Sequence, residues 1–398
     1  MKPIYLDYNA TTPIDPAVLR AMLPYLEFDP NLNELGSYGN PSSTHAFGTR
    51  ARDAVGAARV QVAALLGARP EEILFTSGGT ESSNHAIKGS ASGRRRSDLS
   101  WLGRLMGRRV GGHLVLSAVE HPATAQPVEF LRRHGCRVTV VPVDGAGMVS
   151  PDDVAKAIGP DTLLVSIMHS NNEVGTLMPI AEIARHTRKH GVLLHIDAAQ
   201  SLGKVSVDVG ALGVDLLTVA GHKLYAPKGV GVLYVRKGVT LETFMHGAGH
   251  EGGRRAGTEN VPYVVGLGMA CEIARKSLPE ATRKLRALRD RLWDHLRDAL
   301  GGRIVLNGHP EKRLPNTLNV SFVGHVGADL LASVPGIAAS TGSACHEGAV
   351  TMSPVLCAMG VRPEVGKGAV RLSVGRFTTD DEIDRAAELL LGAVASRA

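Results

Sequence analysis

The sequence predicts an α/β fold in which helices cover both faces of a mainly parallel sheet, followed by a smaller α+β domain. Apolar strand-like runs alternate with helical stretches through the first two thirds of the chain. These runs are apolar on both faces, which is typical of strands in a parallel sheet that helices cover on two sides. After about residue 262 this alternation gives way to a long charged helix and short strands.

The expected elements follow in chain order. Before the first strand we expect helices over 16–26 and 44–67. Seven apolar runs are predicted to be strands: 72–77, 113–120, 137–143, 162–169, 192–197, 214–220 and 229–235. A helix is expected over 180–191, between two of these strands. In the final part we expect helices over 281–301 and 379–395 and short strands over 317–323 and 370–375.

This change of pattern divides the chain into two predicted domains. The large domain is expected over residues 14–262, and the small domain over 1–13 and 263–398. The Arg-rich segment 92–112 is predicted to be an insertion between a helix and a strand. It is either a solvated surface excursion or a docking surface for an acidic partner.

The composition excludes several classes of protein. The chain has 398 residues, of which 44% are hydrophobic and 21% charged, as expected of a globular protein with a large core. A formal net charge of +6 does not indicate nucleic acid by itself, so direct nucleic-acid binding is not expected. No long apolar run is present, so we expect no membrane span and a cytoplasmic location. The four cysteines show no zinc spacing, so no metal site is predicted.

The end of the first predicted strand indicates a phosphate site. In open α/β sheets, ligands bind beyond the carboxyl ends of the strands. The strand over 72–77 is followed by Gly78, Gly79 and Thr80. The glycines allow close approach of the backbone, and free N–H groups at the start of the next helix can bind a phosphate. The same residues also fit an ordinary glycine turn with a threonine cap.

Later strand ends carry a possible stacking ring, an acid and a lysine. His121 could stack on a planar ligand, although a structural role is the commoner one for such a histidine. Asp197 at a buried strand end needs a cation or a donor, which is either a protonated ring nitrogen or a loop contact. Lys223 follows a wholly apolar strand, where desolvation would lower its pKa, although most loop lysines are exposed. Together with the phosphate site, these groups match the needs of pyridoxal phosphate.

A series of motifs covers nearly the whole chain apart from residues 92–112. They are YLDYNATTPIDP (5–16), GNPSSTHAFG (39–48), FTSGGTES (75–82), MHSNNEVG (168–175), HIDAAQS (195–201), GHKLYAPKGVG (221–231), GHEGGRRAGTEN (249–260), STGSACHEG (340–348) and VRLSVGRFTT (370–379). The set resembles the cysteine desulfurases of the NifS/IscS type, which belong to the class V pyridoxal-phosphate-dependent aminotransferases and have fold type I. The resemblance implies a homodimer that removes sulfur from L-cysteine, forming L-alanine and an enzyme-bound persulfide.

The resemblance also implies a role for each matching residue. Lys223 would hold the cofactor as a Schiff base, His121 would stack on its ring and Asp197 would pair with the pyridine nitrogen. Arg371 would bind the substrate carboxylate as a two-point fork, and Asn40 would help at the same group. The further cofactor contacts implied are Asn172 and Gln200 at the ring hydroxyl, Gly79, Thr80 and His222 at the phosphate, and Thr258 from the second subunit.

Cys345 lies among small residues that could not pack into a core. The resemblance implies that it forms the persulfide: its thiolate attacks the substrate sulfur and then carries that sulfur to an acceptor protein. Serving two places requires a loop that moves. The long segment between Cys345 and Arg371 resembles family members with a long mobile loop. His346 either helps to deprotonate the thiol or is an exposed loop residue.

Three questions stay open at this stage. Relatives supply sulfur for iron–sulfur cluster assembly, tRNA thiolation or DNA phosphorothioation. The acceptor is therefore expected to be a scaffold or sulfur-carrier protein. The alternative activity is that of a selenocysteine lyase, which Ala220 would suit, since close relatives usually carry a hydroxyl residue there that bonds the phosphate. A non-catalytic scaffold is disfavoured because Lys223, Asp197, Cys345 and Arg371 are all present.

Overall fold

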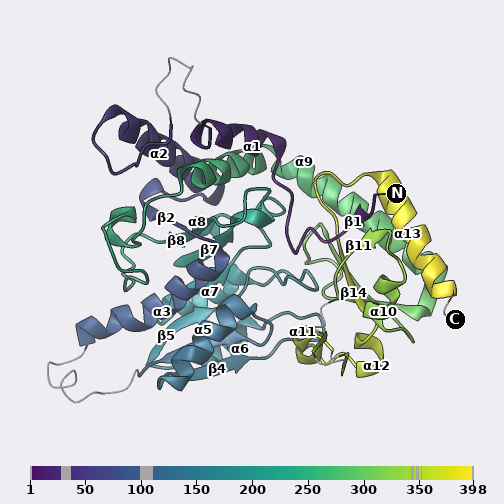
Figure 1. The fold of residues 1–398 in the computed structure, drawn as a ribbon. Helices are drawn as coiled ribbons and strands as arrows, with labels where there is room; N and C mark the ends of the chain where they lie inside the picture. Colours follow the sequence, from purple (N-terminus) through teal and green to yellow (C-terminus); the bar gives the residue numbers. More distant parts are fainter. Residues whose placement is uncertain are drawn as a thin grey trace.

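The protein has two regions, each built around its own sheet (Figure 1). The computed structural model describes residues 2–27, 37–98, 111–341, 345–346, 349–350 and 352–396, with the backbone alone for 92–98, 345–346 and 349–350. The strands and helices of the larger region lie on one side of the view in Figure 1. The two termini lie together on the other side, and helix α9 passes from one region to the other.

The larger sheet contains all seven predicted strands. They are β2 (Ile73–Thr76), β3 (His113–Ser117), β4 (Arg137–Val141), β5 (Thr162–Ser166), β6 (Leu193–Asp197), β7 (Leu216–Ala220) and β8 (Gly231–Val235). Among the described residues their order is β2-β8-β7-β6-β5-β3-β4. The pairs from β7 to β4 are parallel, whereas β8 runs antiparallel to both of its neighbours. The prediction of a mainly parallel sheet is therefore confirmed.

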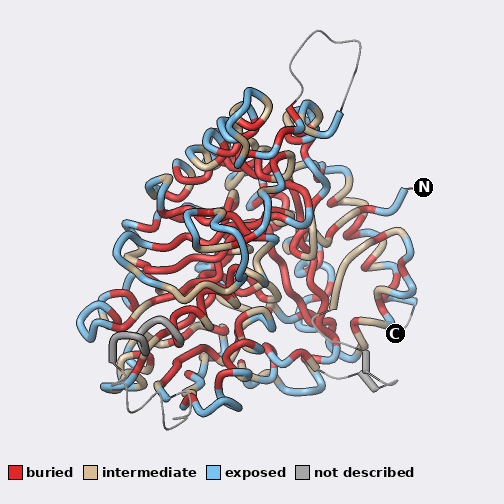
Figure 2. The backbone as a smooth tube through the Cα atoms, turned by 60° about the vertical axis from the view of Figure 1, so that its left-hand side comes forward, coloured by how far each residue is buried: buried red, intermediate tan, exposed pale blue. Residues whose placement is uncertain are grey.

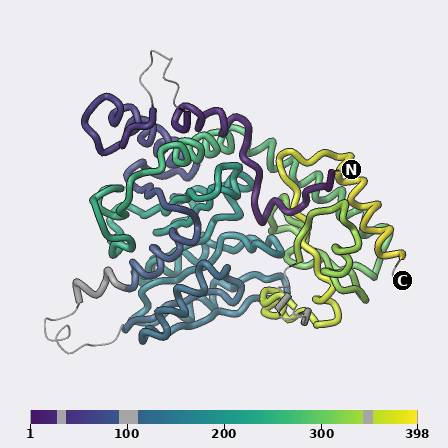
Figure 3. The backbone as a smooth tube through the Cα atoms, viewed as in Figure 1, coloured from purple at the N-terminus to yellow at the C-terminus, as the bar shows by residue number. Residues whose placement is uncertain are grey.

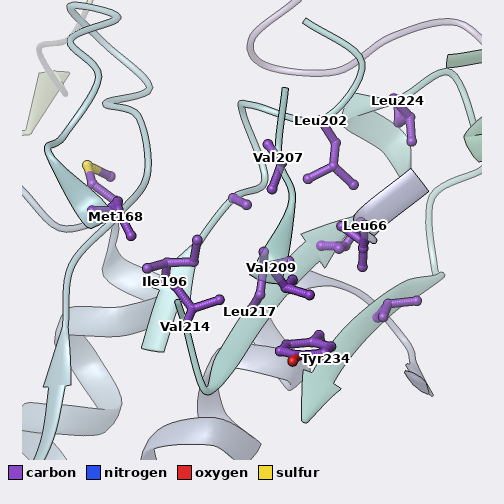
Figure 4. Close-up of a cluster of buried hydrophobic side chains, with 14 of the residues drawn as sticks. Leu66, Met168, Ile196, Leu202, Val207, Val209, Val214, Leu217, Leu224 and Tyr234 are labelled. Atoms are coloured by element: carbon purple, nitrogen blue, oxygen red, sulfur yellow. The ribbon is translucent and has the colours of Figure 1, made fainter. Parts of the chain in front are cut away.

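Helices cover both faces of this sheet, because successive side chains of a strand point to opposite faces. Phe75 packs into a core with α1, α2, α7 and α9, while its neighbour Leu74 packs into a second core with α3 and α5. Figure 4 shows part of the first core, with Ile196 and Leu217 from adjacent strands beside Leu66 from α2. The central strands are buried along their length (Figure 2).

The helices around the large sheet begin and end as follows: α1 (Pro16–Met22), α2 (Ala46–Leu66), α3 (Gly79–Asp98), α5 (Pro122–Arg133), α6 (Pro151–Ala157), α7 (Ile180–Lys189) and α8 (Val209–Leu212). Most begin with a side chain that caps the free N–H groups of the first turn, as Asp15 does for α1. Helix α3 extends into the predicted Arg-rich insertion. The side chains of 92–98 and all of residues 99–110 lie outside the described residues, so the interpretation of 92–112 stays a prediction.

Helix α9 (Val261–Leu300) is longer than the predicted helix over 281–301. Its first part packs with the large sheet through Leu267 and Cys271, and its second part packs in the small core through Leu288 and Leu292. The predicted division at residues 262 and 263 falls at the start of α9, whereas the change of core occurs within the helix. None of the described helices is both long enough and apolar enough to cross a membrane.

The small region contains β9 (Ile304–Asn307), β10 (Thr317–Phe322) and β14 (Ala369–Ser373), which form an antiparallel sheet. Its other elements are α10 (Gly327–Ala332), β11 (Ile337–Ala338), β12 (Cys345–His346), β13 (Ala349–Val350), α11 (Pro354–Ala358), α12 (Pro363–Gly366) and α13 (Asp380–Ala395). The N-terminal strand β1 (Ile4–Tyr5) pairs with β11, so both ends of the chain lie in this region (Figure 3).

The core of the small region gives the first testable prediction. Leu292 is completely buried, so Leu292→Ala should lower the free energy of unfolding by about 2–5 kcal/mol through lost packing and a cavity. Urea denaturation followed by circular dichroism measures this change. Leu19→Ala is the matched control, because Leu19 is 44% exposed. An equal loss in both variants would contradict the assignment of Leu292 to a core.

Candidate active site

A cavity of about 360 Å³ opens at the carboxyl ends of the parallel strands. Its walls include His121 beyond β3, Met168 beyond β5, Asp197 at the end of β6 and Ala220 at the end of β7. Arg371, on β14 of the small region, lines it from the opposite side. The structure brings together here nine of the predicted site residues: Gly79, Thr80, His121, Asn172, Asp197, Gln200, His222, Lys223 and Arg371.

The phosphate site predicted at the start of α3 opens on this cavity. Gly78 has a φ of +148°, a backbone conformation that favours glycine, and α3 begins at the next residue. A Cβ atom on Gly79 would lie only 3.2 Å from the Cβ of Ala220, so glycine lets the helix start approach the end of β7. The positive end of the helix therefore faces the cavity, where it can hold a phosphate.

The ring of His121 is held by the helix that follows it. His121 is the N-cap of α5, and its Nδ1 accepts a hydrogen bond from Ala123 N at 3.1 Å. Nδ1 is thus the acceptor of a neutral ring, and the proton is on Nε2. Burial is the main cause of the lowered pKa of His121, and Lys223 lowers it further. A neutral aromatic ring at the cavity wall suits stacking on a planar cofactor.

Asp197 is the acid of the site. Its Oδ1 accepts a hydrogen bond from Ala199 N at 2.9 Å, which fixes the carboxyl group at the end of β6. Burial raises the pKa of Asp197. A buried carboxyl group of this kind is stabilised as an anion when a cation approaches, so it fits a protonated pyridine nitrogen.

Lys223 lies in a short turn directly after β7, as the sequence predicts. Its Nζ donates to the carbonyl oxygens of Asn9 and Ala10, the latter at 2.8 Å. Burial, together with the nearby charge of Arg371, lowers the pKa of Lys223 to about 8. The amine is therefore far more often neutral at physiological pH than that of an ordinary lysine, as a Schiff-base lysine requires.

Arg371 is fixed at the edge of the cavity by the N-terminal segment. Its Nη2 donates to Asp7 Oδ1 at 2.7 Å, and its Nη1 donates to the carbonyl oxygen of Asn172 at 3.1 Å. The buried Nε of Arg371 has no hydrogen-bond partner. Part of the fork is thus available for a carboxylate.

The remaining cofactor candidates are held by neighbouring polar groups. Gln200 Nε2 donates to the carbonyl oxygen of Asn9 at 2.9 Å. Nδ1 of His222 lies 3.1 Å from Thr11 Oγ1, and burial lowers the pKa of His222 to about 4. His222 is therefore neutral at pH 7 and can only act as a hydrogen-bonding group, not as a charge.

Two predicted residues do not line this cavity. Asn40 and Thr258 are both exposed, and Asn40 Oδ1 accepts a hydrogen bond from Ser42 N at 2.9 Å. Their neighbours Pro41 and Glu259 line a second, more open recess of about 660 Å³. The roles assigned to Asn40 and Thr258 therefore stay predictions.

The side chain of Cys345 lies outside the described residues. Its backbone belongs to β12, which pairs with β13 in a short antiparallel ribbon. The predicted role of Cys345 is therefore not tested by these contacts. Of the other cysteines, Cys136 and Cys271 are buried and Cys357 is exposed.

Asn9 is a site residue that sequence reasoning missed. It is 1% exposed and lines the cavity, and its carbonyl oxygen accepts from both Lys223 and Gln200. Its side chain donates to Asn172 O at 3.2 Å and to Thr317 Oγ1 at 2.8 Å. The only signal in the sequence is an asparagine in a polar stretch after a short strand, which says nothing of these distant partners.

Comparisons with known proteins agree with this site. The aminotransferase class V family model matches residues 4–386. Cysteine desulfurase IscS of Methanosarcina thermophila is 44% identical over 391 residues, which cover 98% of this chain and 91% of that protein. A solved structure of a NifS-like protein has a TM-score of 0.87 at 35% identity, covering 99% of this chain and all of that one. A structure described as SspA in complex with cysteine has a TM-score of 0.79 at 33% identity. The match covers 94% of this chain and 99% of that one.

The chain therefore belongs to the class V aminotransferase family, in its group of cysteine desulfurases. The predicted family, the fold type I architecture and the pyridoxal phosphate cofactor are confirmed. The residues of the cavity fit that cofactor, because a helix N-terminus, a neutral ring, a buried acid and a lysine of lowered pKa surround one space.

The lowered pKa of Lys223 predicts how the apoprotein takes up its cofactor. Only the neutral amine attacks the aldehyde of pyridoxal phosphate. Since the pKa of Lys223 is about 8, the neutral fraction of its amine should rise between about pH 7 and 9. For an ordinary lysine this rise occurs about two pH units higher. The rate at which visible absorbance develops, measured from pH 6 to 10, should therefore level off near pH 9. Lys223→Ala should develop none, and a rate still climbing at pH 10 would contradict the assignment.

Proposed function

We propose that this chain transfers the sulfur of L-cysteine to Cys345, forming L-alanine and a persulfide that is passed to an acceptor protein. The observation that carries the proposal is the convergence of Lys223, Asp197 and Arg371 on one cavity. These groups supply a base, a partner for a ring nitrogen and a carboxylate receptor. A substrate amino acid needs all three together.

Binding comes first. The start of α3 and the neutral His222 would hold the phosphate group of pyridoxal phosphate, and His121 would lie against its ring. Asp197 would accept a hydrogen bond from the pyridine N–H, and its charge would keep that proton in place. Arg371 receives the substrate carboxylate while its Nη2 stays on Asp7, so the substrate is oriented from one side.

The proton transfer and the sulfur transfer follow. Pyridoxal phosphate, when bound, supplies a ring that withdraws electrons from the substrate Cα. Nζ of Lys223 takes the Cα proton, since its lowered pKa keeps part of the amine neutral. The Cys345 thiolate then attacks the substrate sulfur: the new S–S bond forms as the Cβ–S bond breaks. The released electron pair stays on the substrate and Cβ takes up a proton; the proton held by Lys223 Nζ returns to Cα, and L-alanine leaves.

The proposed homodimer would bring Thr258 to the partner's phosphate site. The loop before Thr258 is braced at two points: Glu251 forms an ion pair with Arg59 at 2.6 Å, and Arg255 forms one with Glu81 at 2.9 Å. Glu81 is in the first turn of α3, beside the phosphate site. The braces hold the exposed Thr258 in a defined place on the surface, which supports contact with a second subunit.

For the acceptor, we propose a scaffold or carrier protein of iron–sulfur cluster assembly. Relatives that are 42–44% identical over nearly the full length carry the name IscS, which supports this choice. The persulfide carries one transferable sulfur atom, so the acceptor must present its own nucleophile to it.

The sulfur transfer is tested with L-cysteine. The parent protein should release L-alanine and gain one sulfur atom on Cys345, measured by mass spectrometry of peptides. Cys345→Ala should lose both products. Cys357→Ala is the matched control and should keep both, since Cys357 is an exposed thiol without a predicted role. Alanine from Cys345→Ala, or from L-selenocysteine alone, would instead favour a selenocysteine lyase.

The role of Arg371 predicts a change in substrate affinity. Arg371→Lys keeps the charge but loses the fork that holds Asp7 and a carboxylate together. We expect KM for L-cysteine to rise at least tenfold, with a smaller change in kcat. Arg376→Lys is the control, because Arg376 pairs with Asp15 and does not line the cavity. An unchanged KM in Arg371→Lys would show that another group binds the carboxylate.

A further inference from the structure

Lys204 is a buried lysine that the proposed reaction does not use. It is 6% exposed and lies in the turn that follows β6. Its backbone carbonyl accepts a hydrogen bond from Thr282 Oγ1 of α9 at 2.8 Å, so the turn is tied to the long helix. Within the described part of the chain Lys204 forms no ion pair.

The ammonium group of Lys204 contacts two amide oxygens. Its Nζ donates to Gln200 Oε1 at 3.1 Å and to Asn9 Oδ1 at 3.5 Å. A lysine can only donate, so the oxygen of the Gln200 amide must face Lys204. The NH₂ group of Gln200 is then directed the other way, where Nε2 donates to Asn9 O at 2.9 Å. The Asn9 carbonyl can only accept, so the contacts at the two ends of the amide select the same orientation.

This orientation matters because Gln200 is a wall of the active-site cavity. One hydrogen of its Nε2 is used by the Asn9 carbonyl, and the second is free to meet a ligand. The same carbonyl accepts from Lys223. Lys204 therefore acts on an amide and a carbonyl that both adjoin the reacting lysine.

Burying an ammonium group without a carboxylate is unfavourable. Burial, together with the charges of Lys223 and Arg371, lowers the pKa of Lys204 to about 7. Replacing such a buried charge with an apolar side chain is often neutral or stabilising. The presence of lysine here is therefore not explained by stability, which favours a role in the site.

We propose that Lys204 is a positioning residue: by donating to Gln200 Oε1, it reinforces the orientation that the Asn9 carbonyl also selects and holds the Gln200 NH₂ group toward the cavity, where it meets the ring oxygen of pyridoxal phosphate. This inference rests on the proposed function, since it assigns Gln200 to the bound cofactor. It adds a residue that does not itself touch cofactor or substrate.

The first experiment compares Lys204→Met with the parent holoenzyme. Methionine keeps the length and packing but donates no hydrogen bond. We expect the dissociation constant of pyridoxal phosphate to rise about tenfold and the absorbance spectrum of the bound cofactor to change. kcat should fall with little change in KM for L-cysteine, while the melting temperature should stay the same or rise. Lys284→Met is the matched control. Lys284 and Lys204 both line a small pocket separate from the active-site cavity, but Lys284 is exposed and donates to Arg376 O.

The second experiment is a double-mutant cycle with Gln200→Ala. If Lys204 acts through Gln200, Lys204→Met should weaken cofactor binding in the parent and have no further effect in Gln200→Ala. Equal losses in both backgrounds, or no loss in the parent, would overturn the proposal. A melting temperature that falls in step with activity would also overturn it, since the role would then be structural. If Lys204→Met does not fold, the same cycle is run with Lys204→Leu, which also lacks a donor.

The readouts separate this inference from the proposed function. Cofactor affinity and spectrum are measured without L-cysteine, so they test Lys204 even if no alanine is released. A parent enzyme that binds pyridoxal phosphate but leaves L-cysteine unchanged would reject the proposed function alone. If the parent enzyme releases alanine normally and Lys204→Met changes neither the affinity for the cofactor nor its spectrum, only the inference is rejected.

Discussion

The site depends on three basic side chains that lie near one another: Lys223 and Arg371 line the cavity, and Lys204 is buried behind Gln200. Lys204, Lys223 and Arg371 lie close enough that the positive charges of neighbours lower the pKa of both lysines, in addition to the larger effect of burial. Among the acids, Asp7 pairs with Arg371, and burial raises the pKa of Asp197. The space therefore has excess positive charge. A phosphate and a substrate carboxylate would supply the missing negative charge, which is why anionic ligands suit this cavity.

The same concentration of positive charge explains why Arg371 and Lys223 have different roles. A guanidinium group stays protonated when buried, so Arg371 is suited to hold a carboxylate permanently. An amine loses its proton when it is desolvated and surrounded by cations, so Lys223 is suited to accept and return a proton. Exchanging the two residue types would remove both functions, even though the net charge would not change.

The N-terminal segment connects the two regions around these charges. Strand β1 joins the small region through β11, and Asp7 then reaches Arg371. Asn9 follows and bonds to groups of both regions, among them Lys223 of the large region and Thr317 of the small one. Asp7, Asn9 and Ala10 therefore connect Arg371 to Lys223 at one wall of the cavity. Any movement of one region against the other must break these buried hydrogen bonds.

The sequence predicted most of the sheet and most of the cavity, for one physical reason. Parallel strands buried on both faces are strongly apolar, so their ends are visible, and polar residues beyond those ends must meet at one edge. That rule brought His121, Asp197 and Lys223 together correctly. It could not reveal the antiparallel direction of β8, since an apolar run reads alike in both directions. Nor could it reveal Asn9, whose partners Thr317, Gln200 and Lys223 lie far away in the chain.

The positive charge of the site also explains why a hydroxyl group is not required at residue 220 for phosphate binding. The absent hydroxyl removes one hydrogen bond to the phosphate, on the order of 0.5–1.5 kcal/mol. The small side chain of Ala220 lies beside the start of α3, where a Cβ on Gly79 would come within 3.2 Å of it. The positive end of the helix lines the cavity together with the charged groups of Lys223 and Arg371. Since the phosphate is doubly charged, these fixed charges act on it more strongly than a single neutral donor. One hydroxyl can therefore be lost from this site without loss of its capacity to bind a phosphate.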